Sequence, residues 1–355
     1  MSDSIRIGRR VVGAGKPVYI VAEISANHRQ SYGEAVRLVR AAKDAGADAV
    51  KLQTLTPDTI TMKSDRSWFR VGGGTLWDGR TLYDLYEEAY MPWEWQPKLK
   101  VIADELGLDL FSSPFDPTAV DFLETMGVPA YKVASFEIVD LPLVERMART
   151  HKPLIISTGM ATQREIRDAV ETARAGGARG ILLLKCNSGY PAPPEEMNLR
   201  TIPDMRRRFR IPVGLSDHTL GISAPIAAVA LGACMIEKHF TMSRTVPGPD
   251  SAFSLEPPEF KAMVEAIRTA EKTLGTVRYA PTPAEAKSRP FRRSLFVVQD
   301  VKKGEIFNRN NVRSIRPANG LLPRFLPAIL GRKAAADILR GTPLSWDLVQ
   351  GGRRR

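Results

Sequence analysis

The distribution of apolar and polar residues follows a regular pattern from residue 18 to residue 274. Short apolar runs, typical of buried strands, alternate with longer stretches in which apolar residues recur every three to four positions, typical of amphipathic helices. Strands are predicted over 18–24, 49–53, 109–112, 130–133, 154–157, 180–184, 212–215 and 235–239. Helices are predicted over 34–45, 93–106, 118–126, 143–149, 164–175, 203–209, 223–231 and 260–274.

Each predicted strand is followed by a helix, and the strands are apolar throughout rather than alternating. Continuous apolar runs indicate a parallel sheet that is covered on both faces. Eight successive strand–helix units favour an α/β fold of the closed (β/α)8 TIM-barrel type. An open, doubly wound sheet is the alternative, and it is weakened because no G-x-G-x-x-G motif follows the first strand.

The pattern changes after residue 280, so the barrel domain is assigned to residues 1–280. Residues 281–290 are polar, contain three prolines and are typical of a linker. Residues 291–350 form a small β-rich domain, with two strands predicted around Lys302, Lys303 and Gly304, and residues 351–355 form a basic tail. A domain of this size is marginally stable alone, so we expect support from the barrel or from a second subunit.

The composition is that of a soluble globular enzyme, with 43% hydrophobic and 25% charged residues. No apolar run reaches the length of a membrane span, and the first ten residues lack the apolar core of a secretory leader. The two cysteines, Cys186 and Cys234, lie in apolar, strand-like segments. This placement disfavours a disulfide framework and favours a reducing, cytoplasmic location.

The net charge of +12 is concentrated at the C-terminal end, where residues 291–355 hold 14 Lys and Arg against 4 Asp and Glu. A basic segment can indicate nucleic-acid binding. Here the basic residues are spread along an alternating apolar pattern, and only the arginines at 353–355 cluster. An anionic substrate or the face of a partner subunit explains the charge as well, and we expect neither a nucleic acid nor a membrane as partner.

Polar and charged residues gather where the predicted strands end, which is where a TIM barrel carries its active site. Burying such charges costs several kcal/mol unless they are paired or bound to a ligand, so their convergence indicates an active site. The residues are Glu23, Lys51, Gln53, Ser112, Ser113, Lys132, Ser135, Ser157, Cys186, Asn187, Ser188, Ser216, Asp217, His218, Glu237, Lys238 and His239.

Lys51 and Lys132 belong to the second and fourth predicted strands. We interpret them as a clamp for a phosphate or carboxylate, helped by the hydroxyls of Ser113, Ser135 and Ser157. One alternative is a Schiff-base lysine, as in barrel aldolases. The other is a structural ion pair with Glu23 or Glu137.

Two of the four histidines, His218 and His239, end adjacent predicted strands. Neighbouring strand ends lie close enough for two imidazoles to share one metal and to leave positions open for substrate oxygens. Such a site suits Mn²⁺, Mg²⁺ or Zn²⁺ acting as a Lewis acid. The alternative is that both are core histidines bonded to backbone. His28 is a separate candidate, for a general acid or for a support of the site.

The segment 56–95 is unusually long for a loop of a βα unit and contains four of the five tryptophans, Trp68, Trp77, Trp93 and Trp95. We expect most of these rings to pack within helices of the segment itself, and one or two to contact a sugar. A loop of this length at the active-site end is also a candidate lid.

Nine short motifs then give the chain a resemblance to the sialic acid synthase family. They are AEISANH, VKLQT, FSSPFD, YKVASFE, STGMAT, CNSGYPAP, GLSDHT, EKHFT and GPD. The C-terminal RSIRPANGLLP resembles the SAF (antifreeze-like) domain of those enzymes, and TLWDGRTLYDLYEEAYMPWEW most resembles the pseudaminic acid synthase branch. The combination covers essentially the whole chain.

The resemblance implies condensation of phosphoenolpyruvate with 2,4-diacetamido-2,4,6-trideoxy-altrose and release of phosphate. It implies Mn²⁺ or Mg²⁺ on His218 and His239, proton transfer by Glu23, and a domain-swapped homodimer. The implied phosphoenolpyruvate ligands are Lys51, Ser113, Lys132, Ser135, Ser157, Ser188 and Ser216, and the implied sugar ligands are Gln53, Glu137, Tyr190, Asp250 and Arg316. Two of these positions depart from relatives: Ser113 stands where a relative has threonine, and Ser188 where some have asparagine.

Three other functions stay open from the sequence. Sialic acid and legionaminic acid synthases share the chemistry with a different hexosamine. A Schiff-base aldolase would be trapped by borohydride and would not respond to chelators. A carbohydrate-binding or nucleic-acid-binding protein would release no phosphate.

Overall fold

The computed structural model describes residues 3–352 of the chain, which divides into two compact units, one ending at Gly275 and one beginning at Thr276. Each unit is described by itself. The arginines at 353–355, and with them most of the predicted basic tail, lie outside the described residues.

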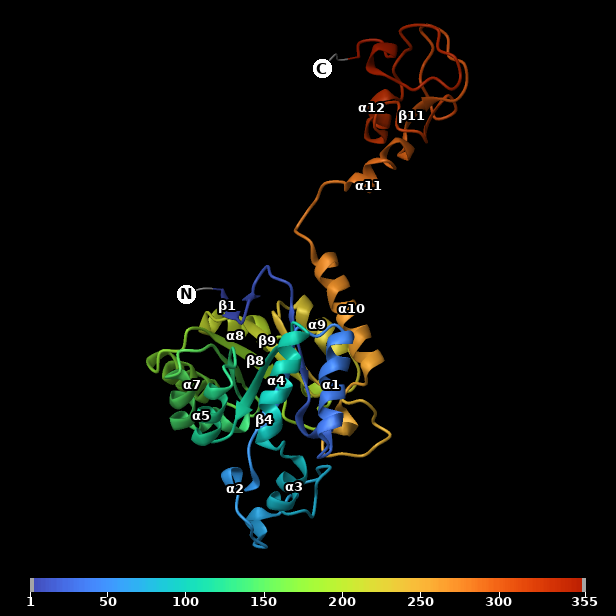
Figure 1. Cartoon of the computed structure of the whole chain (residues 1–355). Coiled ribbons are helices and arrows are strands. Elements are labelled where there is room, and N and C mark those ends of the chain that lie inside the picture. The colour runs from blue at the N-terminus through green and yellow to red at the C-terminus, as the bar shows by residue number, and fades with distance from the viewer. Residues whose placement is uncertain (1–2, 353–355) are drawn as a thin grey trace. The chain divides into compact units, whose positions relative to one another are not determined.

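The first unit is a closed barrel of eight parallel strands, as the apolar runs predict (Figure 1). The strands follow one another around the barrel in chain order, and the last pairs with the first, from Met235 opposite Tyr19 to His239 opposite Glu23. This pairing excludes the open sheet. The strands are β3 (Tyr19–Glu23), β4 (Ala49–Thr54), β5 (Asp109–Pro114), β6 (Tyr131–Val133), β7 (Leu154–Ser157), β8 (Ile181–Cys186), β9 (Val213–Asp217) and β10 (Met235–His239).

Helices surround the barrel and begin at polar caps, as at Ser31, Asp116 and Thr162, whose side chains accept a hydrogen bond from a backbone N–H of the first turn. The helices are α1 (Tyr32–Asp44), α4 (Gln96–Glu105), α5 (Pro117–Thr125), α6 (Leu141–Ala148), α7 (Gln163–Ala175), α8 (Thr201–Phe209), α9 (Ser223–Ala230) and α10 (Pro257–Leu274). Short 3-10 helices lie in the loops: η1 (Ser25–His28), η4 (Phe136–Val139), η5 (Pro194–Glu196) and η6 (Ser251–Phe253).

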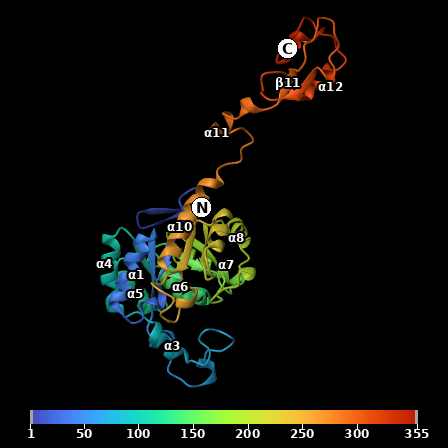
Figure 2. The ribbon, with the colours of Figure 1, turned by 90° about the vertical axis from the view of Figure 1, so that its right-hand side faces the viewer.

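An N-terminal hairpin that the sequence analysis did not predict packs on the inner core of the barrel. It consists of β1 (Ser4–Ile7) and β2 (Arg10–Gly13). Ile5, Ile7 and Val12 join the inner apolar cluster of the barrel. Figures 1 and 2 show the hairpin at one end of the barrel, opposite the end that carries the segment between β4 and α4.

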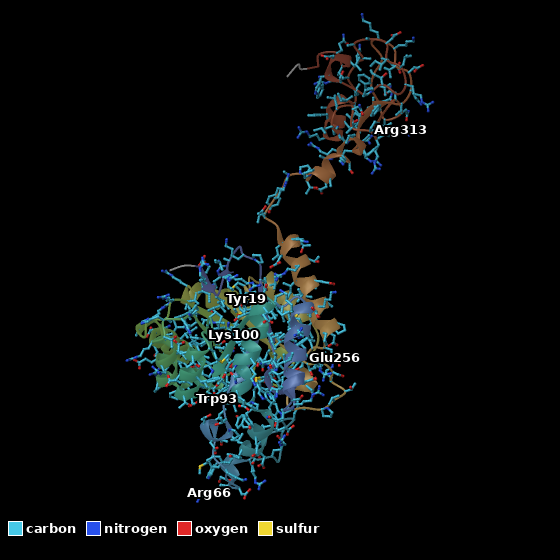
Figure 3. The ribbon with its side chains drawn as sticks, in the orientation of Figure 1. Tyr19, Arg66, Trp93, Lys100, Glu256 and Arg313 are labelled. Atoms are coloured by element: carbon cyan, nitrogen blue, oxygen red, sulfur yellow. The ribbon has the colours of Figure 1, made fainter. Side chains whose placement is uncertain are left out.

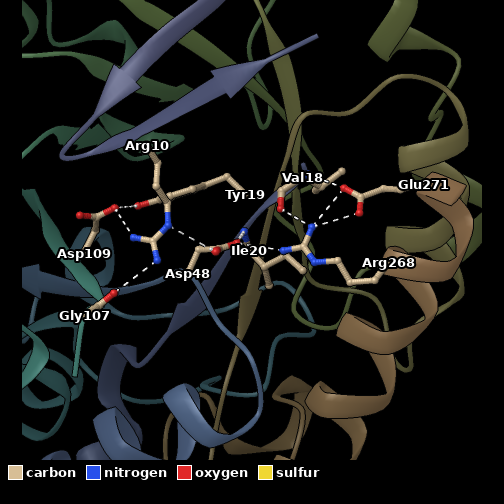
Figure 4. A network of polar contacts seen from close by, with 9 residues as sticks. All are labelled: Arg10, Val18, Tyr19, Ile20, Asp48, Gly107, Asp109, Arg268 and Glu271. Carbon is tan, nitrogen blue, oxygen red and sulfur yellow. Dashed lines mark hydrogen bonds and ion pairs between the residues drawn. The ribbon is translucent and has the colours of Figure 1, made fainter. Parts of the chain in front are cut away.

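Polar contacts tie this end of the barrel together (Figure 4). The Asp109 carboxylate accepts from the Tyr19 hydroxyl at 2.8 Å and from Arg10 of the hairpin at 3.1 Å. On α10, Arg268 donates to the Val18 carbonyl at 2.9 Å and to Asp48 at 3.1 Å. The hairpin, two strands and the last helix are therefore joined where the strands begin.

The segment between β4 and α4 folds into α2 (Pro57–Ile60), η2 (Ser67–Phe69), α3 (Leu82–Ala89) and η3 (Trp93–Trp95). Trp93 stacks on Phe122 with ring centroids 4.9 Å apart, and Trp95 meets His28 edge-on at 5.9 Å. These two rings are structural, as expected for most of the segment. In Figure 3, Trp93 and Arg66 lie toward the end of the barrel away from Tyr19.

The second unit contains a two-stranded antiparallel sheet of β11 (Ser294–Val297) and β12 (Val312–Ile315). The two strands lie on either side of Lys302, Lys303 and Gly304, as predicted, and the second strand starts eight residues after Gly304. Ile306, between them, makes an isolated bridge with Lys333. Leu295, Val297 and Phe307 are among the buried core residues. The helices are α11 (Pro283–Ala286), η7 (Arg289–Phe291), η8 (Pro323–Phe325), α12 (Leu326–Ile329) and η9 (Trp346–Leu348).

The hairpin should contribute strongly to stability. Replacing the buried Ile7 by alanine is expected to lower the free energy of unfolding by about 2–5 kcal/mol, because it leaves a cavity beneath the barrel. Urea titration followed by tryptophan fluorescence measures this loss. Val11→Ala on the exposed side of the hairpin is the control and should stay within about 0.5 kcal/mol of the parent chain. Equal stability of both variants would contradict the role of the hairpin.

Candidate active site at the carboxyl ends of the strands

Along each strand, the side chains that point into the barrel are apolar first and become polar or charged toward the carboxyl end. Side chains in a strand alternate between its two faces, so the residue two positions after an inner apolar residue also points inward. This relation places Glu23 after Val21, Lys51 after Ala49 and Glu237 after Met235. The same spacing adds Ser113 after Phe111, Lys132 after Ala130, Ser157 after Ile155 and Cys186 after Leu184.

Two lysines and two carboxylates form a buried cluster in this polar half. Lys51 Nζ lies 2.5 Å from Glu23 Oε2 and 3.6 Å from Glu237 Oε1. Lys132 Nζ lies 3.5 Å from the same oxygen of Glu237, which also accepts from Ser216 Oγ at 3.1 Å. The ion pair between Lys51 and Glu23, one of the structural alternatives, is therefore present in the structure.

Glu237 was noted at a strand end, but the sequence analysis gave it no role. Its side chain lies between the two lysines, on the same face of β10 as His239. The period of two along β10 was the signal that could have identified it. The predicted pairing of the lysines with Glu137 does not occur within 4 Å in the described part of the chain.

Burial sets the protonation of this cluster. It raises the pKa of Glu23 to about 7, even though Lys51 acts in the opposite direction. Burial also lowers the pKa of Lys132. For Lys51, burial disfavours the ammonium, but the neighbouring carboxylates outweigh it and raise the pKa. Glu23 is therefore a carboxyl that can exchange a proton near neutral pH.

Small polar groups meet around Gly159, which follows β7. The backbone N–H of Gly159 donates to Ser135 Oγ at 3.1 Å. A Cβ atom at this position would come within 2.1 Å of Ser188 Oγ and 2.7 Å of Ser135 Oγ, so a larger residue would force both hydroxyls to move. The Ser157 hydroxyl is buried and lacks a hydrogen-bond partner within the described residues. Ser113 contacts the lysine cluster instead, since Lys51 Nζ donates to its hydroxyl at 3.4 Å.

The two predicted metal ligands are neighbours in space. The ring centroids of His218 and His239 are 5.2 Å apart. His218 Nδ1 lies 2.7 Å from the Asn187 carbonyl, and donation to this oxygen leaves Nε2 with a free lone pair. His239 Nδ1 is buried without a hydrogen-bond partner in the described part of the chain and lies 3.9 Å from Asp250 Oδ2.

This pair fits a divalent cation that takes its other ligands from water or substrate. Burial lowers the pKa of His239 well below its usual value, which keeps that imidazole neutral. Burial opposes a charge on His218 too, but the neighbouring Cys186 outweighs it and raises the pKa of His218, so a proton and a metal would compete there. Within residues 3–352, no group of three or more His, Cys, Asp or Glu side chains converges as a complete metal site.

Aromatic rings form a wall beside the histidines. The Tyr190 ring lies 4.4 Å from His218, and Phe253 lies 5.2 Å from Tyr190. Trp77 packs on Tyr190 with ring centroids 5.6 Å apart, and its indole N–H donates to the Pro249 carbonyl at 2.9 Å. Among the tryptophans of the long segment, Trp77 is thus the one joined to the site by its ring contacts, whereas Trp68 is 82% exposed.

The remaining predicted sugar ligands divide into two groups. Gln53 donates to Glu23 at 3.4 Å, and Asp250 accepts from Ser25. Glu137 keeps one buried oxygen without a partner in the described residues, and burial raises its pKa to about 7. Arg316 belongs to the second unit, where it lines a cavity with three further arginines, Arg289, Arg292 and Arg293.

The chain is similar to known synthases over nearly its whole length. Residues 38–279 match the NeuB family, and residues 292–350 match the SAF domain. Pseudaminic acid synthase of Helicobacter pylori is 47% identical over 337 residues, covering 94% of this chain and 98% of the relative. Its counterpart in Campylobacter jejuni is 46% identical over 329 residues, covering 93% and 96%.

A solved structure shows the same fold. The N-acetylneuraminic acid synthetase of Leptospira borgpetersenii, in complex with citrate, superposes with a TM-score of 0.72 at 30% identity, covering 81% of this chain and 95% of that one. The barrel, its polar strand ends and these relatives agree, and the chain belongs to the NeuB family of synthases and carries a C-terminal SAF domain.

Proposed function

We propose that the protein is a pseudaminic acid synthase, which condenses phosphoenolpyruvate with 2,4-diacetamido-2,4,6-trideoxy-altrose and releases phosphate. The observation that carries this proposal is that two buried lysines and two adjacent imidazoles share the polar half of one barrel. The lysines suit an anion, and the imidazoles suit a cation that activates an aldehyde. The relatives named pseudaminic acid synthase support this choice of sugar.

Phosphoenolpyruvate carries a phosphate and a carboxylate, which repel one another in a site that excludes water. Lys51 and Lys132 would balance these charges. The hydroxyls of Ser113, Ser135, Ser157, Ser188 and Ser216 would donate hydrogen bonds to its oxygens. The orphaned hydroxyl of Ser157 and the close approach at Gly159 support an anion in this part of the barrel.

The reaction then needs an electrophile and a proton carrier. When bound, a divalent cation, Mn²⁺ or Mg²⁺, on His218 and His239 supplies Lewis-acid polarisation of the sugar aldehyde. C3 of phosphoenolpyruvate attacks the aldehyde carbon, water adds to the cationic C2, and phosphate leaves with cleavage of the C–O bond. Glu23, whose pKa is raised to about 7, would carry a proton to the new alkoxide or from the attacking water.

One observation favours a second mechanism, the Schiff-base aldolase. Burial lowers the pKa of Lys132, which is the shift that a nucleophilic amine needs. The carboxylate of Glu237 at 3.5 Å acts in the opposite direction and favours the ammonium form. Borohydride in the presence of pyruvate decides between them, because only a Schiff base gives a covalent adduct on Lys132.

We also propose a domain-swapped homodimer, in which the SAF domain of one subunit brings Arg316 to the sugar of the other. On the loops that follow the strands, Phe136, Val139, Met160 and Leu220 are each at least 59% exposed. Exposed apolar side chains gathered at one end of a barrel are typical of a covered interface. The four arginines around the cavity of the second unit supply a surface for anionic groups.

Turnover should require both a divalent cation and the imidazole pair. With both substrates, the protein is expected to release phosphate, to stop after exhaustive EDTA treatment and to recover with Mn²⁺ or Mg²⁺. His239→Ala should abolish release with the fold intact, whereas His151→Ala, which changes an exposed histidine, should not. Full activity after chelation would contradict the Lewis-acid role.

Lys132→Met should weaken phosphoenolpyruvate binding by about one to two decades, because a charge-assisted contact is worth about 1.5–3 kcal/mol. Sugar binding should change little. Lys185→Met is a matched control, since Lys185 also lies near a strand end but donates to the Cys186 carbonyl. Isothermal titration measures both affinities, and an unchanged affinity for phosphoenolpyruvate would make Lys132 a structural residue.

The enzyme should prefer the altrose-configured, 6-deoxy sugar over N-acetylmannosamine. An aromatic wall suits a methyl and an acetamido group, and it rejects an added hydroxyl only by about 10²-fold, so a residual rate on the second sugar is expected. Trp77→Ala should lower the ratio of kcat/KM for the altrose-configured sugar to kcat/KM for N-acetylmannosamine. Trp68→Ala should leave this ratio unchanged. Equal efficiency of the parent enzyme on both sugars would contradict the pseudaminic acid assignment.

The swapped arrangement predicts complementation between two inactive variants. Arg316→Ala has an intact barrel, and His239→Ala has an intact SAF domain, so a mixed dimer holds one complete site. Co-expression in equal amounts should restore about a quarter of the parent activity, because half of the dimers are mixed and each has one working site. Activity no greater than the average of the two single variants would place Arg316 in its own subunit's site or outside any site.

A further inference from the structure

A second charged pair lies behind the histidines, on the outer face of the barrel wall. Lys238 Nζ is 2.5 Å from Asp217 Oδ2, and both side chains are 0% exposed. Side chains alternate along a strand, so Lys238 points away from Glu237 and His239. The pair is buried in the apolar layer between the strands and the surrounding helices. Leu215 and Ile236 belong to this layer.

The pair also holds the backbone that carries His218. The Asp217 carboxylate accepts from the Thr219 N–H and from the Thr219 hydroxyl, each at 3.1 Å. Lys238 Nζ donates to the Thr219 carbonyl as well. The residues on both sides of His218 are therefore fixed from the outer face, while its ring is turned to the inner face.

The backbone pairing of β9 and β10 ends at this point. Its last matched pair is Lys238 with Asp217, so the ladder does not extend to the two histidines. His218 follows the end of β9, and His239 is the last residue of β10. The ion pair thus joins β9 and β10 at the point where their backbone pairing ends. The residue that follows each member of the pair is a histidine, and the two imidazole rings are 5.2 Å apart.

Stability alone does not explain such a pair. Removing two charges from water is costly, and a buried ion pair can often be replaced by apolar residues of similar size without loss of stability. Its placement beside both imidazoles gives it a different role. We propose that Lys238 and Asp217 are positioning residues that set, from outside the barrel, the separation and orientation of His218 and His239.

The positioning role rests on the proposed function only in assuming that the two histidines bind a metal. The first readout therefore measures the histidine rings themselves, without a metal. The chain has four histidines, and ¹⁵N-histidine labelling resolves their ring nitrogens. The parent protein should show a hydrogen-bonded Nδ1–H from His218 to Asn187. In the double variant with Asp217→Leu and Lys238→Met, this signal should shift or broaden, while the signals of His28 and His151 and the thermal midpoint stay as in the parent.

The second readout is the affinity for Mn²⁺ alone, measured by electron paramagnetic resonance. Changes in groups that orient metal ligands typically reduce affinity 10–100-fold, and the double variant should fall in this range. Its kcat should drop by a similar factor, while KM for phosphoenolpyruvate stays within about twofold, since the anion-binding lysines are untouched. Lys185→Met is the control and should match the parent in every readout.

Each outcome decides the proposal. A double variant with parent-like His218 signals and parent-like Mn²⁺ affinity would overturn it. Failure of the double variant to fold would also overturn it, because the pair would then be needed for stability itself. If the parent protein binds no Mn²⁺, the metal in the proposed function is wrong, and the shift of the His218 signal still tests the positioning role.

Discussion

The structure depends on the compensation of charge inside a closed barrel. Lys51 and Lys132 lie in the barrel interior, where an unpaired ammonium would cost several kcal/mol. Glu23 and Glu237 provide the opposite charges from strands that adjoin across the closure of the barrel, since β10 pairs with β3. The polar half of the interior therefore exists only because the sheet closes, and closure brings the first and last strands of the barrel together.

Burial of apolar side chains in the other half of the interior offsets the free-energy cost of burying these charges. Val21, Phe111, Ile155 and Met235 fill the barrel below the charges, and the β1–β2 hairpin adds Ile5, Ile7 and Val12 to the same cluster. The division follows from the two-residue period of the strands, because each charged residue stands two positions after an apolar one. The outer face carries its own compensated pair, Lys238 and Asp217, among the residues that pack against the helices.

Much of this could be predicted from sequence because the barrel strands are short and apolar on both faces. All eight were located within three residues of their observed ends, and His218 and His239 were correctly placed side by side. The hairpin was missed because its residues alternate only briefly around Gly8. Glu237 was left without a role, and the Lys238–Asp217 pair was not predicted, because both depend on strand register, which places partners 21 residues apart in contact.

The central claim is that the lysine cluster binds phosphoenolpyruvate for a condensation in which the C–O bond is cleaved. Phosphoenolpyruvate labelled with ¹⁸O in the bridge between C2 and phosphorus tests it directly. The labelled compound is incubated with the protein, the 6-deoxy sugar and Mn²⁺, and the phosphate is read by ³¹P nuclear magnetic resonance. The account predicts phosphate that retains the bridging ¹⁸O. Phosphate without this label, or no phosphate under these conditions, would contradict it.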